Sequence, residues 1–385
     1  MGTKIKKQKY HQVSFMPWAD FKDELQIGPV LFWSFTNADT KIKNQSLLKH
    51  LTRYFSSYVD HQGKAVDTIV VCSYKKNNFR CLSKKEYSDL RDAVNMLTFC
   101  AIAPTVKNAV CANNRSMGPS SSEVFQLITQ NFIPGNNHIA VRAGNLLSGG
   151  WEMGEVTFPK PWSTGGFFKS PNEELMSGFN KMFENNVSVE VRERIFRSLE
   201  WFRLSHVQNE DVSFLSKIVM MATAFEILLQ VPNVPNKKGW IAEKLDEQVK
   251  CSEFIKLTRT DNKGKKHRCS KLYWWAWDFY NLRNSIVHGE HIEPKLQRYH
   301  VSDKKWINYH IVADLVFLEC VKRELFNMGC IGDNARDCAK KWDESFPDEK
   351  DESATQLLAE WFLGIKDVYR AMGWLRKNKK YSTKR

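Results

Sequence analysis

The sequence predicts an α+β protein, in which an N-terminal mixed α/β domain precedes an all-α helical bundle. Short β-branched and aromatic runs alternate with helical patterns in roughly the first 170 residues. From about residue 172 glycine and proline thin out, and long patterns of helical spacing take over. A length of 385 residues exceeds one typical core, so at least two domains are expected.

The N-terminal domain is expected to contain short strands and two helices. Residues 30–35 and 68–74 are the clearest strand candidates, and 138–142 and 153–158 are further ones. Apolar residues at helical spacing predict a helix over 46–58.

The second N-terminal helix is predicted over residues 83–103. Ser83 followed by Glu86 matches a capping box, in which each residue satisfies a backbone N–H of the other. Pro104 is expected to end this helix, because proline lacks the N–H that the helix needs.

The C-terminal half is predicted to be helical throughout. We expect domains at residues 1–175 and 176–330, followed by a helical extension with a basic tail at 331–385. Pro232, Gly289 and Gly329 stand where helices should stop. The predicted helices cover residues 189–206, 212–231, 240–249, 271–288, 308–327 and 357–375.

Composition points to a cytoplasmic protein outside the membrane. No run of about 18 apolar residues is long enough to span a bilayer. The basic first nine residues are followed by no apolar signal segment. The nine cysteines include no Cys-x2-Cys pair, so reduced thiols are expected rather than a disulfide framework.

The net charge of +14 indicates a polyanionic partner, nucleic acid above all, although solubility alone is the plainer explanation. Residues 259–271 carry six basic side chains and one acidic one, and they read as a loop before the 271–288 helix. Such a loop would attract a nucleic-acid backbone, with an affinity that falls as salt rises. The residues expected to bind nucleic acid are Lys263, Lys265, Lys266, Arg268 and Lys271.

The most informative segment is 283–289, which reads RNSIVHG. Asn284 and His288 are four residues apart and share a helix face, and Arg283 is adjacent. Gly289 suits the position directly after the end of a helix. His288 would then lie at the negative end of the helix dipole, which favours the imidazolium form of its side chain. An arginine that holds phosphate, a histidine that moves a proton and an asparagine that orients either would suffice to cut RNA without a metal. The plainer alternative is an ordinary helix end.

Other chemistries find little support in the sequence. His288 and His291 could form a metal pair, but no third or fourth ligand is evident, so neither a metal nor a cofactor is expected. Phosphate-loop and serine-nucleophile motifs are absent. The aromatic run 273–277 could stack on bases, but helical spacing favours a core or interface role for at least two of its tryptophans.

Four segments resemble HEPN domains, specifically the Apea-like group, over residues 189–330. Residues 280–290, YNLRNSIVHGE, resemble the Arg-Asn-x-x-x-His signature, and 224–229, AFEILL, is similar to the group's Ala-x-Glu-x-Leu helix. The short 240–245 helix falls between them, and Arg323-Glu324-Leu325 is similar to part of the final helix. The resemblance implies a four- to five-helix fold and a metal-independent ribonuclease that acts as a homodimer with a composite site.

The resemblance also implies a role for each residue of the motif. His288 would transfer the proton, Arg283 would clamp the phosphate and Asn284 would assist. Glu226 matches the acidic residue that packs behind the motif, where it would anchor Arg283 or serve structure alone. A single histidine can take the proton of the RNA 2′-hydroxyl while its twin protonates the leaving oxygen.

The expected function is therefore a metal-independent RNA endonuclease. Nucleases of this kind commonly serve bacterial anti-phage defence by abortive infection, which the resemblance implies here. The N-terminal domain would then sense or regulate, alone or through a trigger protein. One alternative is a catalytically silent HEPN module that binds RNA or protein, which would show no dependence on His288. The other is a DNA-binding regulator, which strand preference in a binding assay would reveal.

Overall fold

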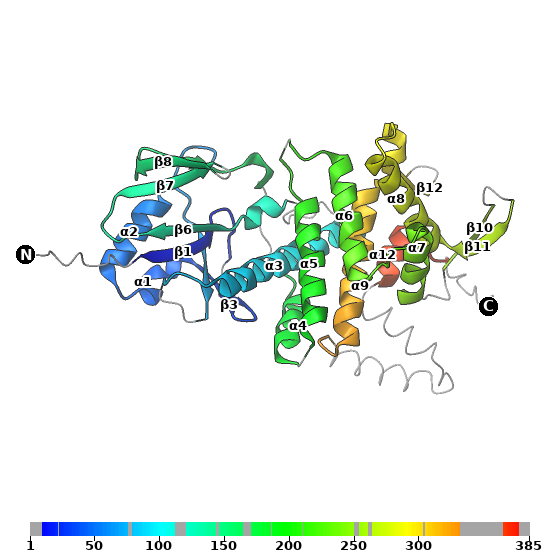
Figure 1. Ribbon diagram of the computed structural model, residues 1–385, viewed down its shortest axis with the longest axis horizontal. Coiled ribbons are helices and arrows are strands. Elements are labelled where there is room, and N and C mark those ends of the chain that lie inside the picture. Colours follow the sequence, from blue (N-terminus) through cyan, green and yellow to red (C-terminus); the bar gives the residue numbers. More distant parts are fainter. Residues whose placement is uncertain are drawn as a thin grey trace, which may run out of the picture. The chain divides into compact units, whose positions relative to one another are not determined.

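The computed structural model describes residues 10–21, 23–75, 79–111, 121–143, 146–164, 171–185, 187–209, 211–249, 254–260, 264–302, 305–331 and 365–376. The chain forms two compact units (Figure 1). The first comprises Met1–Ile102, Met117–Pro171 and His206–Asn209, and the second comprises Ala103–Ser116, Asn172–Ser205 and Glu210–Arg385. The chain is mixed α and β, with a sheet in the first unit and mainly helices in the second, as predicted.

A five-stranded antiparallel sheet forms the described core of the first unit, in the order β2-β3-β5-β1-β6. The predicted strands at 30–35 and 68–74 are confirmed as β3 and β5, whereas β1, β2 and β6 were not predicted. The bounds are β1 His11–Met16, β2 Leu25–Ile27, β3 Val30–Ser34, β5 Val70–Tyr74 and β6 Ile128–Phe132.

Helix α2, Gln45–Phe55, covers one face of this sheet. Phe15 pairs with Val71 and Trp33 pairs with the same residue, so the three side chains share a face. They pack with the apolar side of α2, where Phe55 lies 4.8 Å from the Phe15 ring. The predicted 46–58 helix is thus confirmed, and it ends before Tyr58. The shorter helices of this unit are α1 Ala38–Lys41, η1 Phe35–Asn37, η2 Ser122–Phe125 and η3 Trp162–Thr164.

Two further strand pairs belong to the first unit. The predicted strand at 138–142 is β7, His138–Ala143, which pairs with β8, Leu146–Glu152. The predicted strand at 153–158 is wrong, because Gly154 adopts φ +100° and turns the chain. Only β9, Phe158–Pro159, forms there, parallel to β4, Tyr58–Val59.

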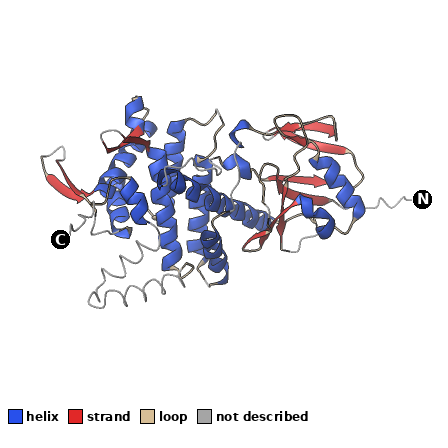
Figure 2. Ribbon diagram, turned by 180° about the vertical axis from the view of Figure 1, so that it is seen from behind, coloured by secondary structure: helices blue, strands red, loops and turns tan. Residues whose placement is uncertain are grey.

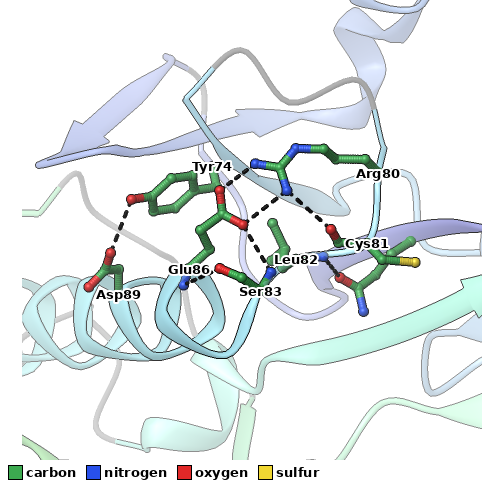
Figure 3. Close-up of polar contacts among 8 residues, drawn as sticks. Tyr74, Arg80, Cys81, Leu82, Ser83, Glu86 and Asp89 are labelled. Carbon is green, nitrogen blue, oxygen red and sulfur yellow. Dashed lines mark hydrogen bonds and ion pairs between the residues drawn. The ribbon is translucent and has the colours of Figure 1, made fainter.

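Helix α3, Lys84–Cys111, begins with the predicted capping box (Figure 3). The N–H of Glu86 donates to the Ser83 hydroxyl at 3.3 Å, and the N–H of Ser83 donates to the Glu86 carboxylate at 2.9 Å. Arg80 adds an ion pair to the same carboxylate. The predicted stop at Pro104 is wrong. Residues 99–103 are buried, and this packing outweighs the one helix hydrogen bond that proline removes.

Helices make up most of the second unit (Figure 2). The predicted helices at 189–206, 212–231, 240–249, 271–288 and 308–327 are confirmed to within a few residues, whereas α4 was not predicted. Of the predicted 357–375 helix, residues 357–364 lie outside the described part. The bounds are α4 Glu173–Glu184, α5 Val189–Ser205, α6 Phe214–Leu228, α7 Lys237–Gln248, α8 Lys271–Val287, α9 Tyr309–Asn327 and α12 Ile365–Ala371.

Aromatic side chains join these helices in a common core. Phe317 of α9 stacks on Phe202 of α5 with ring centroids 5.5 Å apart, and it meets Phe225 of α6 edge-on at 5.3 Å. Trp275 of α8 is fully buried and extends the contact from Phe225 to Trp374. Helices α6 and α8, which carry the candidate site, are therefore held by one packed interior.

The prediction of an all-α C-terminal domain is wrong, because two β-hairpins interrupt the helices. Strands β10, Lys256–Thr260, and β11, Lys266–Ser270, form the hairpin between α7 and α8. Strands β12, Arg298–Ser302, and β13, Lys305–Asn308, form the second, after the short helix η4, Pro294–Gln297. The segment predicted as a basic loop is largely the first hairpin, since its side chains alternate between exposed and half-buried.

Candidate functional site

The Arg-Asn-x-x-x-His motif lies at the carboxyl end of α8, where two backbone hydrogen bonds close the helix. The N–H of Gly289 donates to the Ile286 carbonyl at 3.1 Å. The N–H of Glu290 donates to the Ser285 carbonyl at 2.9 Å. Gly289 has φ +72°, which is the left-handed conformation that this closure requires. His288 is the C-cap residue, so its side chain leaves the helix at a fixed point.

All three motif side chains line one pocket of about 470 Å³ in the second unit. His288 is exposed there, whereas Arg283 and Asn284 are half-buried. The other walls come from the segment before α7, from the first turn of that helix and from α8 itself. The lining residues are Val234, Pro235, Lys237, Lys238, Tyr280, Arg283, Asn284 and His288.

Glu226, in the last turn of α6, contacts the motif from behind. Its carboxylate forms an ion pair with the Arg283 guanidinium at 3.3 Å and accepts a hydrogen bond from the Tyr280 hydroxyl at 2.6 Å. Arg283 also donates to the Asn284 side-chain oxygen at 3.2 Å and lies 5.3 Å from the centre of the Tyr280 ring. Burial and then the Glu226 carboxylate raise the pKa of Tyr280, which keeps its proton on this bond. The guanidinium is thus held in one orientation.

Two lysines that sequence reasoning missed complete the pocket. Lys237 lies 3.6 Å from the second oxygen of Glu226. Lys238 donates to the Asn281 side-chain oxygen at 3.1 Å and lies 4.5 Å from the centre of the Trp277 ring. The Asn281 partner of Lys238 is 43 residues along the sequence, so no local pattern marks this contact. The only available signal was a pair of lysines at a helix start.

The start of α7 fixes where these lysines emerge. The Asn236 side chain caps the helix by accepting the N–H of Gly239 at 3.3 Å. A Cβ at Gly239 would lie 2.4 Å from the Asn236 amide nitrogen, so a larger residue there would displace the capping side chain. Lys237 and Lys238 therefore occupy the first two positions of a capped helix.

The basic residues expected to bind nucleic acid fall into three groups. Lys266 and Arg268 are exposed on one face of β11, and Lys265 is exposed just before that strand. Lys263 lies outside the described residues. Lys271 lies in a different setting, because its ammonium donates to the Gly373 carbonyl at 2.9 Å and burial lowers its pKa.

The hairpin is attached to the amino end of α8, far from the pocket. Arg259 of β10 forms an ion pair with Asp278 at 2.9 Å and lies over the Trp274 ring at 4.8 Å. Trp274 donates its indole N–H to the Leu257 carbonyl at 3.0 Å. The twelve residues from the start of α8 to Arg283 span about 18 Å of helix. The exposed cations of the hairpin and the motif therefore stand at opposite ends of one rigid helix.

The aromatic run at 273–277 mainly supports packing. Trp274 and Trp275 are buried, so the expectation of at least two core tryptophans is confirmed. Trp277 is half-buried, and the Lys238 ammonium lies over its ring.

Comparison of the chain with protein-family models, curated protein sequences and solved structures found no match. The resemblance to HEPN domains therefore stays a prediction from the sequence. In the part of the chain that the structure describes, no helix combines the length and apolar character that crossing a membrane requires.

The arrangement is suited to handling an anion. Three cations and one histidine line the pocket, and none of its described lining residues is acidic. Arg283 offers planar, charge-assisted hydrogen bonds to phosphate oxygens, and an exposed imidazole beside it is able to accept or donate a proton.

Proposed function

We propose that this chain is a metal-independent RNA endonuclease. The observation that carries the proposal is the single pocket that gathers Arg283, Asn284 and His288, with Glu226 bonded to the guanidinium from behind. A helix end of the ordinary kind would leave the arginine free to point into solvent. Here a carboxylate, a tyrosine ring and an amide fix it toward the same space as the imidazole.

RNA supplies the nucleophile in the proposed reaction. His288 takes the proton of the 2′-hydroxyl as the 2′-oxygen bonds to phosphorus, and Arg283 stabilises the negative charge that builds on the phosphoryl oxygens. The bond from phosphorus to the 5′-oxygen breaks, and His288 of a second copy returns a proton to that oxygen. The products are a 2′,3′-cyclic phosphate and a free 5′-hydroxyl. Asn284 assists by accepting from the guanidinium.

The proposed assembly is a cytoplasmic homodimer joined through the helical unit. Lys265, Lys266 and Arg268 would draw the RNA backbone to the far end of α8 by charge, without reading sequence. The first unit would regulate the nuclease, alone or with a trigger protein. The biological role that fits such an enzyme is bacterial defence by abortive infection.

A matched nuclease assay tests the proposal. The wild type, His288→Ala and His291→Ala are incubated in EDTA with end-labelled single-stranded RNA, tRNA and DNA. We expect the wild type and His291→Ala to cut RNA alone, because His291 is exposed outside the pocket. His288→Ala should lose about 10²–10⁴-fold in rate. Equal cutting by all three proteins would overturn the proposal. RNA or protein binding without cutting would favour a silent module, and a preference for DNA would favour a regulator.

A further inference from the structure

The pocket carries more positive charge than one phosphodiester requires. Lys237, Lys238 and Arg283 line it, and Glu226 is the carboxylate bonded to two of them. Three cations against one carboxylate leave two positive charges uncompensated. A single phosphodiester group brings one negative charge, so the pocket has positive charge left for a second anionic group.

The lysines are held in place before any ligand binds. Lys237 is tied to Glu226, and Lys238 is fixed between an amide oxygen and a tryptophan face. A lysine ammonium has three N–H donors, so Lys238 retains donors for a ligand after bonding to Asn281. Cations fixed in advance lose little entropy when an anion arrives.

The two lysines come from α7, whereas the motif comes from α8. Glu226 lies between these groups, since its two oxygens contact Arg283 at 3.3 Å and Lys237 at 3.6 Å. The two lysines and the guanidinium are therefore neighbours within one pocket. They form two separate groups of hydrogen-bond donors, one on each helix. This arrangement offers separate donors to two successive phosphates on one strand.

We propose that Lys237 and Lys238 bind the phosphate next to the scissile one, so that the pocket holds two consecutive phosphates of a single RNA strand. This inference rests on the proposed function, because it takes Arg283 and His288 to act on the scissile phosphate. It makes the lysines binding residues for substrate rather than part of the proton transfer. It also predicts that a dinucleoside monophosphate, which has one phosphate, is a poor substrate.

The test combines lysine variants with neutral phosphates. Each oligoribonucleotide carries one methylphosphonate, which is an uncharged analogue of a phosphate group. In one substrate it lies on the 5′ side of the mapped cleavage position, and in the other it lies on the 3′ side. Wild type is compared with Lys237→Met, Lys238→Met and the double variant. The control is Lys244→Met on the same helix, whose ammonium lies over Trp240 outside the pocket. Thermal melts confirm that each variant folds.

The inference expects one of the two methylphosphonates to lower kcat/KM about tenfold or more in wild type and in Lys244→Met. The double lysine variant should show the same loss with ordinary RNA and little further loss with that methylphosphonate. If the loss in kcat/KM from the lysine substitutions and the loss from the methylphosphonate add for both substrates, the inference is overturned.

Binding without cutting separates this inference from the proposed function. A fully 2′-deoxy oligonucleotide is titrated against salt, and losing one phosphate contact should lower the slope of log K against log salt by roughly 0.7 in the double lysine variant. An unchanged slope would overturn the inference even if RNA is cut. A lowered slope with no RNA cutting by any protein would support a two-phosphate pocket and reject the nuclease reaction.

Discussion

At the residue scale, Glu226 connects the cations of the pocket. It accepts from the Tyr280 hydroxyl at 2.6 Å and contacts both Arg283 and Lys237. Its own side chain is only 19% exposed, so water competes weakly for these bonds. A carboxylate in this position sets the direction of the guanidinium rather than touching substrate, which makes Glu226 a positioning residue.

Glu226→Gln should therefore slow the chemical step more than it weakens binding. The amide keeps an acceptor for Tyr280 but loses the charge that orients Arg283, so kcat should fall by on the order of 10²-fold while KM changes little. The measurement is steady-state cleavage of a short RNA. Glu247→Gln is the control, because that carboxylate pairs with Lys244 on the exposed side of α7. A variant that cuts at the wild-type rate would show that Glu226 is structural only.

Acid sensitivity of the first unit should depend on Glu86. Hydrogen bonds from Arg80 and from the Ser83 backbone lower the pKa of Glu86 from 4.5 to about 2 (Figure 3). Because the pKa is lower in the folded state, the stabilisation is complete above about pH 4.5 and disappears as the pH falls toward 2. Urea unfolding gives the free energy of unfolding of each protein. The gap in this free energy between the wild type and Glu86→Gln should be largest at pH 5 and should narrow at pH 2.5. A gap that is constant with pH would contradict this linkage.

At the element scale, the carboxyl end of α8 decides where the imidazole lies. His288 caps the helix, and the left-handed Gly289 permits the two closing hydrogen bonds. The same helix carries the hairpin anchor at Asp278 near its middle. One rigid element thus links the surface cations to the pocket, so local changes at its end should reach the chemistry.

Gly289→Ala should reduce both stability and cutting. A Cβ at φ +72° meets no neighbour, so the cost is backbone strain of about 1–2 kcal/mol. The strain can be relieved by unwinding the helix end, which would displace His288. The matched control is Gly63→Ala in the first unit, at φ +78° and equally without neighbours. Urea unfolding should show similar losses for both, whereas only Gly289→Ala should cut more slowly. Equal cutting by both variants would refute the role of the helix end.

At the scale of the whole molecule, the proposal requires two copies of the chain. Val287, beside the motif histidine, is 52% exposed. A composite site would bring this helix end against its twin and cover that surface.

Val287→Asp should therefore weaken the dimer and the nuclease together. Sedimentation equilibrium should show a larger monomer fraction. At low protein concentration, the rate of RNA cutting should fall in proportion to the loss of dimer. Leu296→Asp is the control, since Leu296 is 51% exposed in η4. If Val287→Asp behaves like the control, the interface lies elsewhere.

Sequence predicts the helices of the second unit well because their apolar spacing is long and their stops are marked by glycine or proline. It also places the motif at the end of α8, since Gly289 is a local signal. The hairpin before α8 was missed because charged and threonine residues dominate its short strands, and only pairing across the turn stabilises them. The pocket lysines were missed for a related reason: Lys238 finds its amide partner 43 residues away.

The most direct test of the account is cutting in EDTA of a DNA strand that carries a single ribonucleotide at the mapped cleavage position. We predict that the wild type cuts at that nucleotide alone and leaves a 2′,3′-cyclic phosphate, because the 2′-hydroxyl is the nucleophile. The all-DNA strand should remain intact. Cutting of the all-DNA strand, or a requirement for added metal, would contradict the mechanism that we assign to Arg283 and His288.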